Sequence, residues 1–307
     1  MFNEVSAQLE SEYPQLGAIT VKQQFKSGLD RAANTFLVST LDERTFVAKG
    51  ILVANSIQKL STEWWALKLI MERAPGTAPR LLFPEHKPMH FVLMEFLRGT
   101  NAETELVNGS DPAATFTLIG KELARLHAVK VDSFGTPEAP VDDWKTFVQQ
   151  KLAERFNSAL NFLPVPLAEK TQSYTNSLLP ALENEVENQP VLIHRDPYPH
   201  NVLLTPEKDR ATLLDYAMAM GGRPFFDFAK VLLYESKQRA NITEAFLSGY
   251  GLSREEVIES KELIRLYTII EILGQISYFE RIQMPDKRRA TVETLERFVT
   301  QDTSLLS

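Results

Sequence analysis

Residues 191–204 read VLIHRDPYPHNVLL and place a polar loop between two apolar runs. The polar side chains are those of His194, Arg195, Asp196, His200 and Asn201. Short apolar runs of this kind predict buried strands, and a polar group between buried strands costs free energy unless it is paired or used. Two prolines between Asp196 and Asn201 predict a tight, non-helical loop. We expect the flanking strands to hold this loop rigidly at a functional site.

A further acid, Asp215, follows Asn201 after fourteen positions and lies between LL and YAM. Because ATLLDYAM (211–218) reads as the strand that follows the hairpin turn TPEKDR, we expect Asp215 beside the loop. Asn and Asp oxygens suit Mg²⁺, which prefers hard oxygen ligands together with substrate phosphates. Asn201 and Asp215 are therefore candidate magnesium ligands, and Asp196 is left as a base that could orient a hydroxyl.

Outward from this stretch, the hydrophobic pattern changes once along the chain. Residues 19–25, 34–41, 45–53 and 90–97 read as strands, and 61–74 reads as a helix. Helical spacing follows over 111–130, 143–160 and 167–187, and again from about residue 225 onward. This predicts an α+β fold with a strand-rich N-terminal lobe, residues 1–96, and a mainly helical C-terminal lobe, residues 97–307.

The spacing H-R-D-x-x-x-x-N, followed by a metal-binding Asp, resembles the machinery of kinases. The segments LMEFLRG, LARLHAV, HRDPYPHN, LLDYAMAMGGRPFFDFA and FLSGYGL occur in the order typical of the aminoglycoside phosphotransferase and choline kinase superfamily. The resemblance extends from about residue 20 to about residue 280. It implies a bilobal protein-kinase-like fold and an ATP- and Mg²⁺-dependent transfer of the γ-phosphate to a hydroxyl of a small molecule, such as an aminoglycoside or other antibiotic, an amino alcohol or a sugar.

The same resemblance implies the parts of a nucleotide site. Asp196 corresponds to the catalytic base, and Asn201 and Asp215 to the metal ligands. Lys49, in the strand FVAKG, is implied to hold the α- and β-phosphates and to pair with Glu63 of the following helix. The remaining nucleotide contacts implied are the backbone near Glu95 and Leu97 for adenine, and Ser27 and Gly28 for phosphate.

Two features depart from the family pattern. A small residue is usual where Arg195 stands, and we expect Arg195 to pair with a local carboxylate such as Asp227. The nucleotide loop KSGLDRAAN contains one glycine, Gly28, instead of a glycine-rich run, although its backbone amides and Ser27 could still approach a phosphate.

Each candidate also has a purely structural interpretation. Asp-Pro is common in turns, so Asp196 could be a turn residue. Asn201 and Asp215 could be a cap and a turn residue, Lys49 a solvated strand residue, and Glu63 an acid favoured in the first turn of a helix. The two other function classes are a protein kinase and a kinase-fold ATP-binding regulatory protein. Only eleven residues separate Asp215 from Asp227 and no A-P-E follows, which disfavours a protein kinase.

Several residues around the site keep open roles at this stage. We expect His194 and Asp227 to hold the loop by hydrogen bonds and His127 to be a packing residue, whereas His200 could face the substrate or merely cover the loop. Four acids could attract an amine or could be solvated helix charges: Asp142, Asp143, Glu271 and Glu280. Tyr250 and Tyr278 could line the acceptor pocket or belong to the core.

Composition excludes several other classes. The chain has 307 residues and a formal net charge of −7, which disfavours a nucleic-acid partner. It has no cysteine, which excludes disulfides, thiol catalysis and thiolate metal sites. No run of 18 apolar residues indicates a membrane span, and the N-terminus lacks the pattern of a secretory signal. We expect a cytoplasmic protein; its oligomeric state is not evident from the sequence.

Overall fold

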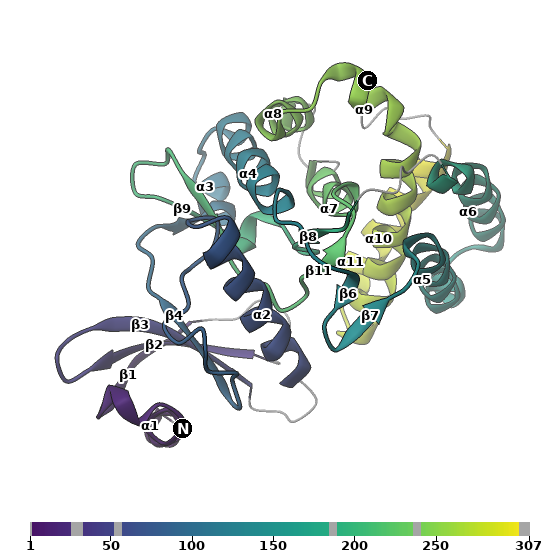
Figure 1. Cartoon of the computed structure of the whole chain (residues 1–307). Helices are drawn as coiled ribbons and strands as arrows, with labels where there is room; N and C mark the ends of the chain where they lie inside the picture. The colour runs from purple at the N-terminus through teal and green to yellow at the C-terminus, as the bar shows by residue number, and fades with distance from the viewer. Residues whose placement is uncertain (1, 26–32, 52–56, 184–188, 236–240, 301–307) are drawn as a thin grey trace.

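The computed structural model describes residues 2–25, 33–51, 57–183, 189–235 and 241–300. Figure 1 shows a strand-rich N-terminal part and a larger, mainly helical C-terminal part. Both were expected, and so was the α+β class. The boundary between residues 96 and 97 stays a prediction. Strand β4 (Phe91–Glu95) ends there, and the chain continues through coil into β5 (Thr100–Asn101), which pairs with β9 (Val202–Leu204) of the C-terminal part.

The N-terminal part is built on one antiparallel sheet with the order β1-β2-β3-β4. Its first three strands are β1 (Ile19–Phe25), β2 (Ala33–Thr40) and β3 (Thr45–Ile51). Alternate residues of β3 face opposite sides of the sheet. Phe46 and Ala48 belong to the core on the α1 side, whereas Val47 packs into the core that contains residues of α2 (Ile57–Arg73). The period of two places Lys49 on the α2 side as well.

Helix α1 (Phe2–Glu12) covers the other face of this sheet and was not predicted from the sequence. Val5 and Leu9, one helical turn apart, are buried against the sheet. A short 3-10 turn, η1 (Pro14–Leu16), follows, and the hydroxyl of the buried Tyr13 donates a hydrogen bond of 2.5 Å to the backbone oxygen of Phe91. Two buried apolar residues in eleven give a weak sequence pattern, so the tertiary contacts decide this helix.

The C-terminal part combines helices with two small sheets. One sheet has the order β10-β9-β5 and the other β7-β6-β11-β8. The elements from β5 onward, apart from β9, are α3 (Ala102–Val107), α4 (Pro112–His127), β6 (Phe134–Thr136), β7 (Ala139–Val141), α5 (Trp144–Ala159), η3 (Leu160–Phe162), α6 (Val165–Leu178), η4 (Leu179–Glu183), β8 (Val191–Ile193), η5 (Pro199–Asn201), β10 (Ala211–Leu213), β11 (Met220–Gly222), α7 (Phe225–Glu235), α8 (Asn241–Tyr250), α9 (Arg254–Glu259), α10 (Lys261–Arg281) and α11 (Pro285–Thr300).

The expected hairpin is β9 and β10, which pair antiparallel across residues 205–210. Strand β8, which precedes the polar loop, belongs instead to the second sheet, where it pairs with β11. The polar loop therefore leaves one sheet and enters the other. Strands β6 and β7 are only three residues long and carry no strong pattern, and they were not predicted.

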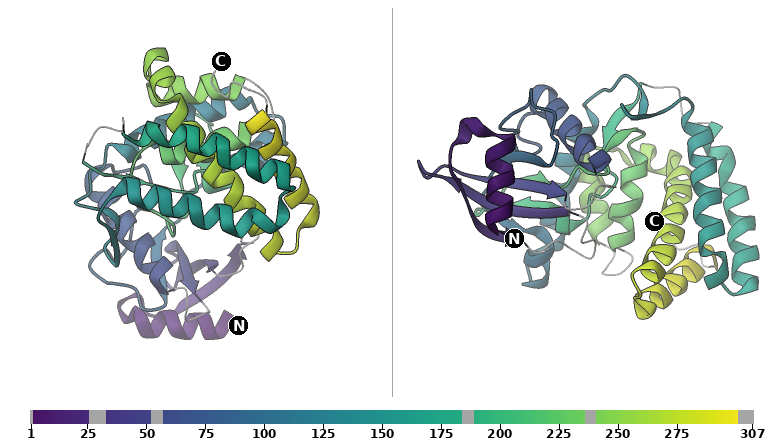
Figure 2. Two further views of the ribbon diagram at one scale, coloured as in Figure 1. Left: turned by 90° about the vertical axis from the view of Figure 1, so that its right-hand side faces the viewer. Right: turned by 90° about the horizontal axis from the view of Figure 1, so that it is seen from below.

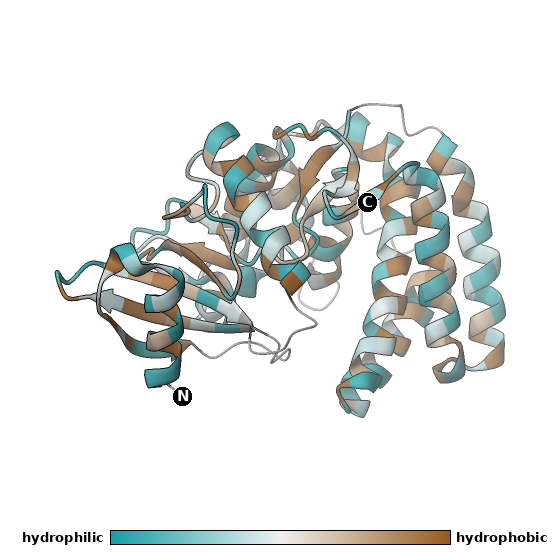
Figure 3. Ribbon diagram, turned by 60° about the horizontal axis from the view of Figure 1, so that its bottom comes forward, coloured by the Kyte–Doolittle hydropathy of each residue, from teal (hydrophilic) through white to brown (hydrophobic). Residues whose placement is uncertain are grey.

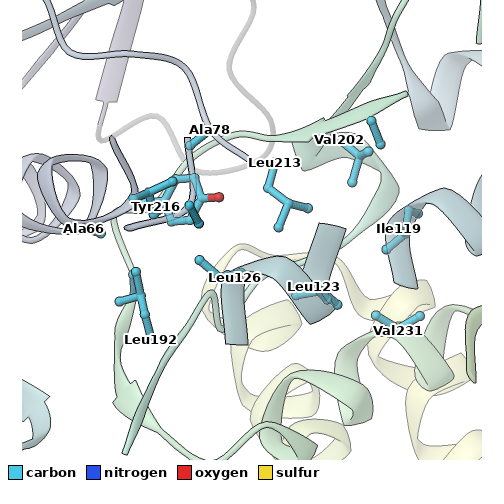
Figure 4. Packing of buried hydrophobic residues seen from close by; sticks show 14 of the residues in the cluster. Ala66, Ala78, Ile119, Leu123, Leu126, Leu192, Val202, Leu213, Tyr216 and Val231 are labelled. Carbon is cyan, nitrogen blue, oxygen red and sulfur yellow. The ribbon is translucent and has the colours of Figure 1, made fainter. Parts of the chain in front are cut away.

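One hydrophobic cluster joins the two parts of the molecule. It includes Ala66 of α2, Leu123 and Leu126 of α4, Leu213 of β10, and Tyr216. Figure 4 shows these side chains directed into one common interior. Residues on both sides of the polar loop, and on both sides of Asp215, are thereby fixed to the same core.

Helices α5 and α6 lie side by side and pack with α10 and α11 (Figure 2). Helix α10 has buried residues over most of its circumference, which is typical of a helix in the interior of a domain. Along the ribbon of Figure 3, hydrophobic and hydrophilic residues alternate over short distances. Among the described helices, none combines the length and the apolar character that a membrane crossing requires.

Helix α5 begins at an acid that the sequence left open as a binding residue. Asp143 is its N-cap, and a carboxylate oxygen accepts a hydrogen bond of 2.7 Å from the backbone N–H of Thr146. The preceding Asp142 is also exposed but lies outside the helix. Asp143 therefore satisfies one of the free N–H groups at the helix start.

We expect Asp143→Ala to lower the free energy of unfolding by about 1 kcal/mol, because the cap hydrogen bond is lost. Asp142→Ala is the matched control and should change it by less than about 0.5 kcal/mol. Urea unfolding of both variants measures the difference. Equal stability of the two variants would contradict the capping role of Asp143.

Candidate active site

One buried carboxylate anchors the loop of residues 194–201. Asp227, in the first turn of α7, is fully buried. One of its oxygens accepts a hydrogen bond of 2.7 Å from the backbone N–H of His194, and the other accepts one of 2.7 Å from that of Arg195. His127 of α4 approaches Asp227 to 3.1 Å through Nε2, and its Nδ1 lies 2.9 Å from the hydroxyl of Tyr250. Asp227 thus anchors the start of the loop, as expected, whereas His127 takes part in hydrogen bonding in addition to its packing role.

The side chain of Arg195 does not pair with Asp227 as expected. Instead, the backbone N–H of Arg195 donates a hydrogen bond to the carboxylate of Asp227. The guanidinium instead lies over the ring of Phe226, with 5.7 Å between its carbon and the ring centroid. Arg195 has a φ of 66°, in the left-handed region that favours small residues such as glycine. This strained conformation turns the loop sharply after β8, and the two hydrogen bonds to Asp227 stabilise it.

His194 ties the loop to the strand on its other side. Its Nε2 lies 2.9 Å from the backbone oxygen of Leu214, and its Nδ1 lies 3.2 Å from the backbone nitrogen of Asp196. Because Nδ1 faces an N–H donor, the ring carries its hydrogen on Nε2. Burial lowers the pKa of His194, although Asp227 and Asp196 oppose this shift. A neutral, hydrogen-bonded His194 matches the structural role expected of it.

Asp196 and Asn201 face each other across the loop. The side-chain amide of Asn201 donates hydrogen bonds of 2.9 Å to the backbone oxygen and to the carboxylate of Asp196. Asn201 is buried, whereas a third of the Asp196 side chain, 33%, is exposed. With its amide nitrogen engaged by Asp196, Asn201 retains its side-chain oxygen as a ligand.

A lysine and a histidine side chain approach the carboxylate of Asp196. Lys230 Nζ lies 3.6 Å from one of its oxygens, and His200 Nε2 lies 3.7 Å from the other. Burial raises the pKa of Asp196, but His200 and Lys230 outweigh this effect and lower it overall. Burial disfavours the charged form of His200, and the carboxylate of Asp196 reverses this and raises the pKa of His200. Asp196 is therefore ionised at neutral pH and has one partly exposed face.

Asp215 meets a lysine from the other part of the molecule. Lys49 Nζ lies 2.7 Å from a carboxylate oxygen of Asp215 and 2.7 Å from one of Glu63, which α2 contributes. Glu63 also accepts a hydrogen bond of 3.3 Å from the backbone N–H of Tyr216. Burial alone would lower the pKa of Lys49, but the two carboxylates raise it, so the lysine is charged. Burial raises the pKa of Asp215, and Lys49 outweighs burial and lowers it.

The oxygen atoms of this region suit a magnesium ion. Asp215, whose side chain is 47% exposed and whose φ is 65°, turns its carboxylate outward at the end of β10. The backbone N–H of Leu214 donates a hydrogen bond of 2.8 Å to the backbone oxygen of Asn201, which brings the two candidate ligands side by side. Among the described residues, no group of three or more His, Cys, Asp or Glu side chains forms a metal site. A carboxylate and an amide oxygen fit Mg²⁺ that keeps its other ligands from phosphates and water.

The structure describes only some of the residues that the resemblance implied as further nucleotide contacts. Glu95 ends β4, and its backbone N–H already donates to the backbone oxygen of Arg80 at 2.9 Å. Leu97 lies in the coil between β4 and β5. Ser27 and Gly28 lie outside the described residues. The structure thus brings together Lys49, Glu63, Asp196, Asn201 and Asp215, and it leaves the loop contacts as sequence-based expectations.

Three of the four acids that could have attracted an amine have partners within the protein. Asp143 is a helix cap, and Glu280 forms an ion pair with Arg288. Glu271 of α10 pairs with Lys230 at 2.9 Å and is therefore not a solvated charge. Tyr250, beside His127, packs against the core of α4 and α8, and Tyr278 lies under the guanidinium of Arg281 at 5.3 Å.

Sequence reasoning missed Lys230. It lies in α7 between the buried residues Ala229 and Val231, three positions after Asp227. A lysine inside such an apolar run is costly to bury without a partner, which is the signal that could have identified it.

The chain was compared with protein families, curated sequences and solved structures. No match was found among curated protein sequences. Among solved structures, the chain is similar to a thermostable mutant of the aminoglycoside phosphotransferase APH(4)-Ia in complex with ADP and hygromycin B. The TM-score is 0.68 at 16% identity, and the match covers 98% of this chain and 99% of that one.

Two further structures give the same result. The aminoglycoside phosphotransferase APH(2″)-IIIa, in complex with GDP and kanamycin, has a TM-score of 0.65 and 15% identity over 96% of this chain and 98% of its own. A protein from Thermobifida fusca assigned as a fructosamine-3-kinase has a TM-score of 0.63 and 18% identity over 95% and 99%. These likenesses confirm the expected bilobal, kinase-like fold.

The model of a phosphotransferase enzyme family matches residues 23–260, which is well over half of the sequence. This match confirms the resemblance noted from the motifs and the expectation of a phosphotransferase. The chain belongs to the phosphotransferase enzyme family.

Proposed function

We propose that the protein is an ATP- and Mg²⁺-dependent kinase that transfers the γ-phosphate to a hydroxyl of a small molecule. One observation carries this proposal. Lys49 from the N-terminal sheet reaches Asp215 at 2.7 Å, next to the loop in which Asn201 holds Asp196. A phosphate-binding cation, two oxygen ligands for a metal and a partly exposed carboxylate then lie in one place, and phosphoryl transfer requires this combination.

Asp196 is proposed to act on the acceptor. Its ionised carboxylate accepts a hydrogen bond from the acceptor hydroxyl and aligns the hydroxyl oxygen with the γ-phosphorus. As the new O–P bond forms, the bond from phosphorus to the β–γ bridging oxygen breaks, and ADP leaves with that electron pair. The hydroxyl proton passes to Asp196 and then to water. The two hydrogen bonds from the Asn201 amide keep Asp196 in place during this step.

Lys49, Asn201 and Asp215 are proposed to hold the nucleotide phosphates. Glu63 fixes the Lys49 ammonium from the side opposite Asp215, so that the lysine stays directed at the phosphates. The oxygens of Asn201 and Asp215 would hold Mg²⁺, which when bound neutralises charge on the β- and γ-phosphates. Glu95 and Leu97 for adenine, and Ser27 and Gly28 for phosphate, complete the proposed nucleotide site.

A small molecule fits better than a protein as the acceptor. The eleven residues between Asp215 and Asp227 contain β11, which pairs with both β6 and β8. That stretch is therefore built into a sheet and offers no long segment on which a peptide could dock. A regulatory protein without turnover would not need Asp196 in addition to the nucleotide-binding groups. Structures of the same fold bind hygromycin B and kanamycin, which are hydroxylated small molecules.

Asp196→Asn should lower turnover by roughly 10²- to 10⁴-fold, because the neutral amide cannot accept the acceptor's proton. The affinity for Mg·ATP should change by less than about threefold, since asparagine still accepts the hydrogen bond from Asn201. ADP release measures turnover, and calorimetry measures nucleotide binding. Asp209→Asn, in the exposed turn between β9 and β10, is the matched control and should retain activity. Wild-type turnover in Asp196→Asn would refute the assignment of the base.

Asp215→Asn should weaken the binding of a non-hydrolysable ATP analogue in Mg²⁺ by about tenfold or more, because a charged metal ligand is lost. In EDTA the same variant should bind the analogue at least as well as the wild type, since a negative charge beside the phosphates has been removed. Calorimetry with and without Mg²⁺ gives both values. If Mg²⁺ strengthens binding equally in the variant and the wild type, Asp215 is not a metal ligand.

A further inference from the structure

Three basic side chains lie around the loop that carries Asp196. Lys230 comes from α7, Arg155 from α5, and Arg195 directly precedes Asp196 in the loop. We call these three residues the cationic cluster. Helices α5, α7 and α10 pack on one another in this region. None of these three residues is needed to bind the nucleotide in the proposed mechanism.

One face of α10 organises the cationic cluster. Glu271, Gly274 and Gln275 are spaced by three and four positions and therefore share that face. Glu271 pairs with Lys230 at 2.9 Å, and Gln275 donates a hydrogen bond of 2.6 Å to the hydroxyl of Tyr198 in the loop. The same face of α10 therefore contacts both α7 and the loop that carries Asp196.

Gly274 makes room for Arg155. A Cβ atom at this position would lie 3.2 Å from Nε and 3.4 Å from the guanidinium carbon of Arg155. Gly274 lies in the interior of α10, where glycine weakens a helix and where no unusual backbone angle requires it. Its close approach to Arg155 shows that the guanidinium rests against α10 one turn from Glu271.

The carboxylates around the cationic cluster are each engaged by other partners. Asp227 accepts hydrogen bonds from the backbone N–H groups of His194 and Arg195, and Asp196 accepts one from Asn201 and lies 3.6 Å from Lys230. Glu271 is paired with Lys230, and Glu154 forms an ion pair with Lys151 at 2.6 Å. Within the described part of the chain, neither Arg155 nor Arg195 has a carboxylate within ion-pair distance, and the buried Nε of Arg195 has no hydrogen-bond partner.

The two arginines also repel each other. Burial lowers the pKa of Arg195 and the positive charge of Arg155 adds to this shift, whereas Glu271, Asp227 and Asp196 oppose it. An anion between the two guanidinium groups would relieve this repulsion and would satisfy donors that have no partner in the protein.

We infer that the acceptor carries, besides the hydroxyl that receives phosphate, an oxyanion that binds Arg155 and Arg195. This inference rests on the proposed function, which places the acceptor hydroxyl at Asp196. Carboxylate and phosphate ester groups share the required chemistry, because either can accept two parallel hydrogen bonds from a guanidinium. A polycation such as an aminoglycoside would instead be repelled by Lys230 and both arginines.

The cationic cluster would also reduce a charge repulsion that arises in the reaction. An anionic acceptor is repelled by the γ-phosphate that it must approach. Cations beside Asp196 lower this repulsion, and they act most strongly where water is partly excluded. Lys230, with 17% of its side chain exposed and 3.6 Å from Asp196, is placed to act on both the base and the bound acceptor.

The test uses acceptors that share a carbon skeleton and differ in charge. On three carbons these are glycerate, glycerol 3-phosphate, glycerol and serinol; on six carbons they are gluconate, glucose 6-phosphate, glucose and glucosamine. Binding to the full chain is measured by calorimetry and by the thermal unfolding midpoint at constant ionic strength. Saturating Mg²⁺ and a non-hydrolysable ATP analogue keep the added anions out of the nucleotide site.

We expect saturable binding by anionic members of the set and none by the two amines. Arg155→Gln should weaken anion binding by about tenfold or more, and Arg155→Lys, which keeps the charge, should recover part of the loss. Arg289→Gln is the matched control. It removes one positive charge from a side chain that is 72% exposed on α11, and it should bind anions as the wild type does. The midpoint of each unliganded variant establishes that it is folded.

Preferential binding of the amines, absence of binding by every anion, or equal anion binding in Arg155→Gln and the wild type would each overturn the inference. ADP release with the same set separates it from the proposed function. Transfer to a neutral or amine acceptor alone would refute the anion site and leave the kinase. Anion binding that depends on Arg155, without transfer to any member, would support the anion site and count against the kinase.

Discussion

The carboxylate of Asp227 is the constraint on which the proposed active site depends. It is fully buried, and a buried charge is tolerated only where hydrogen bonds replace its lost hydration. Two backbone N–H groups of the loop, at His194 and Arg195, supply these bonds. Moving the loop away from α7 would therefore remove two of the hydrogen bonds that stabilise this buried carboxylate. These two hydrogen bonds also fix the position of Asp196, because Asp196 follows Arg195 directly.

A second constraint links the two parts of the molecule. Lys49 lies between Glu63 and Asp215 at 2.7 Å from each, so that the N-terminal sheet, α2 and the segment after β10 are linked through one cation. The hydrophobic cluster that contains Ala66 and Tyr216 lies beside these charges and holds α2 against the C-terminal part. Packing fixes the distance between the parts, and the charges then fix the orientation of the side chains. Both are needed before a phosphate chain can be held between Lys49 and the loop.

Much of this could be predicted from the sequence, because the relevant signals are local. The loop is marked by polar residues and prolines between apolar runs, and β3 by a short apolar run that contains Lys49. The resemblance to kinases implied the pairing of Lys49 with Glu63, and the two side chains form an ion pair. The hairpin of β9 and β10 followed from two apolar runs around a turn.

The parts that could not be predicted depend on tertiary contacts. Helix α1 has too few apolar residues to be recognised without the sheet that it covers. The direction of the Arg195 side chain is set by a left-handed backbone and by Phe226, neither of which the motif reveals. Glu271 read as a possible amine ligand because its partner, Lys230, lies 41 positions away in the chain. Arg155 and Lys230 come close to the same face of α10 only in the folded chain, because α5, α7 and α10 are far apart in the sequence.

The most direct test of the central claim is to follow where the phosphate goes. Phosphorus NMR of the protein with Mg·ATP and a panel of hydroxylated acceptors, including the anionic set, antibiotics and amino alcohols, resolves ADP, inorganic phosphate and phosphate esters in one spectrum. The account predicts that with at least one acceptor a new phosphate monoester signal grows at the same rate as ADP. ADP formation matched only by inorganic phosphate, or no consumption of ATP with any acceptor, would contradict it.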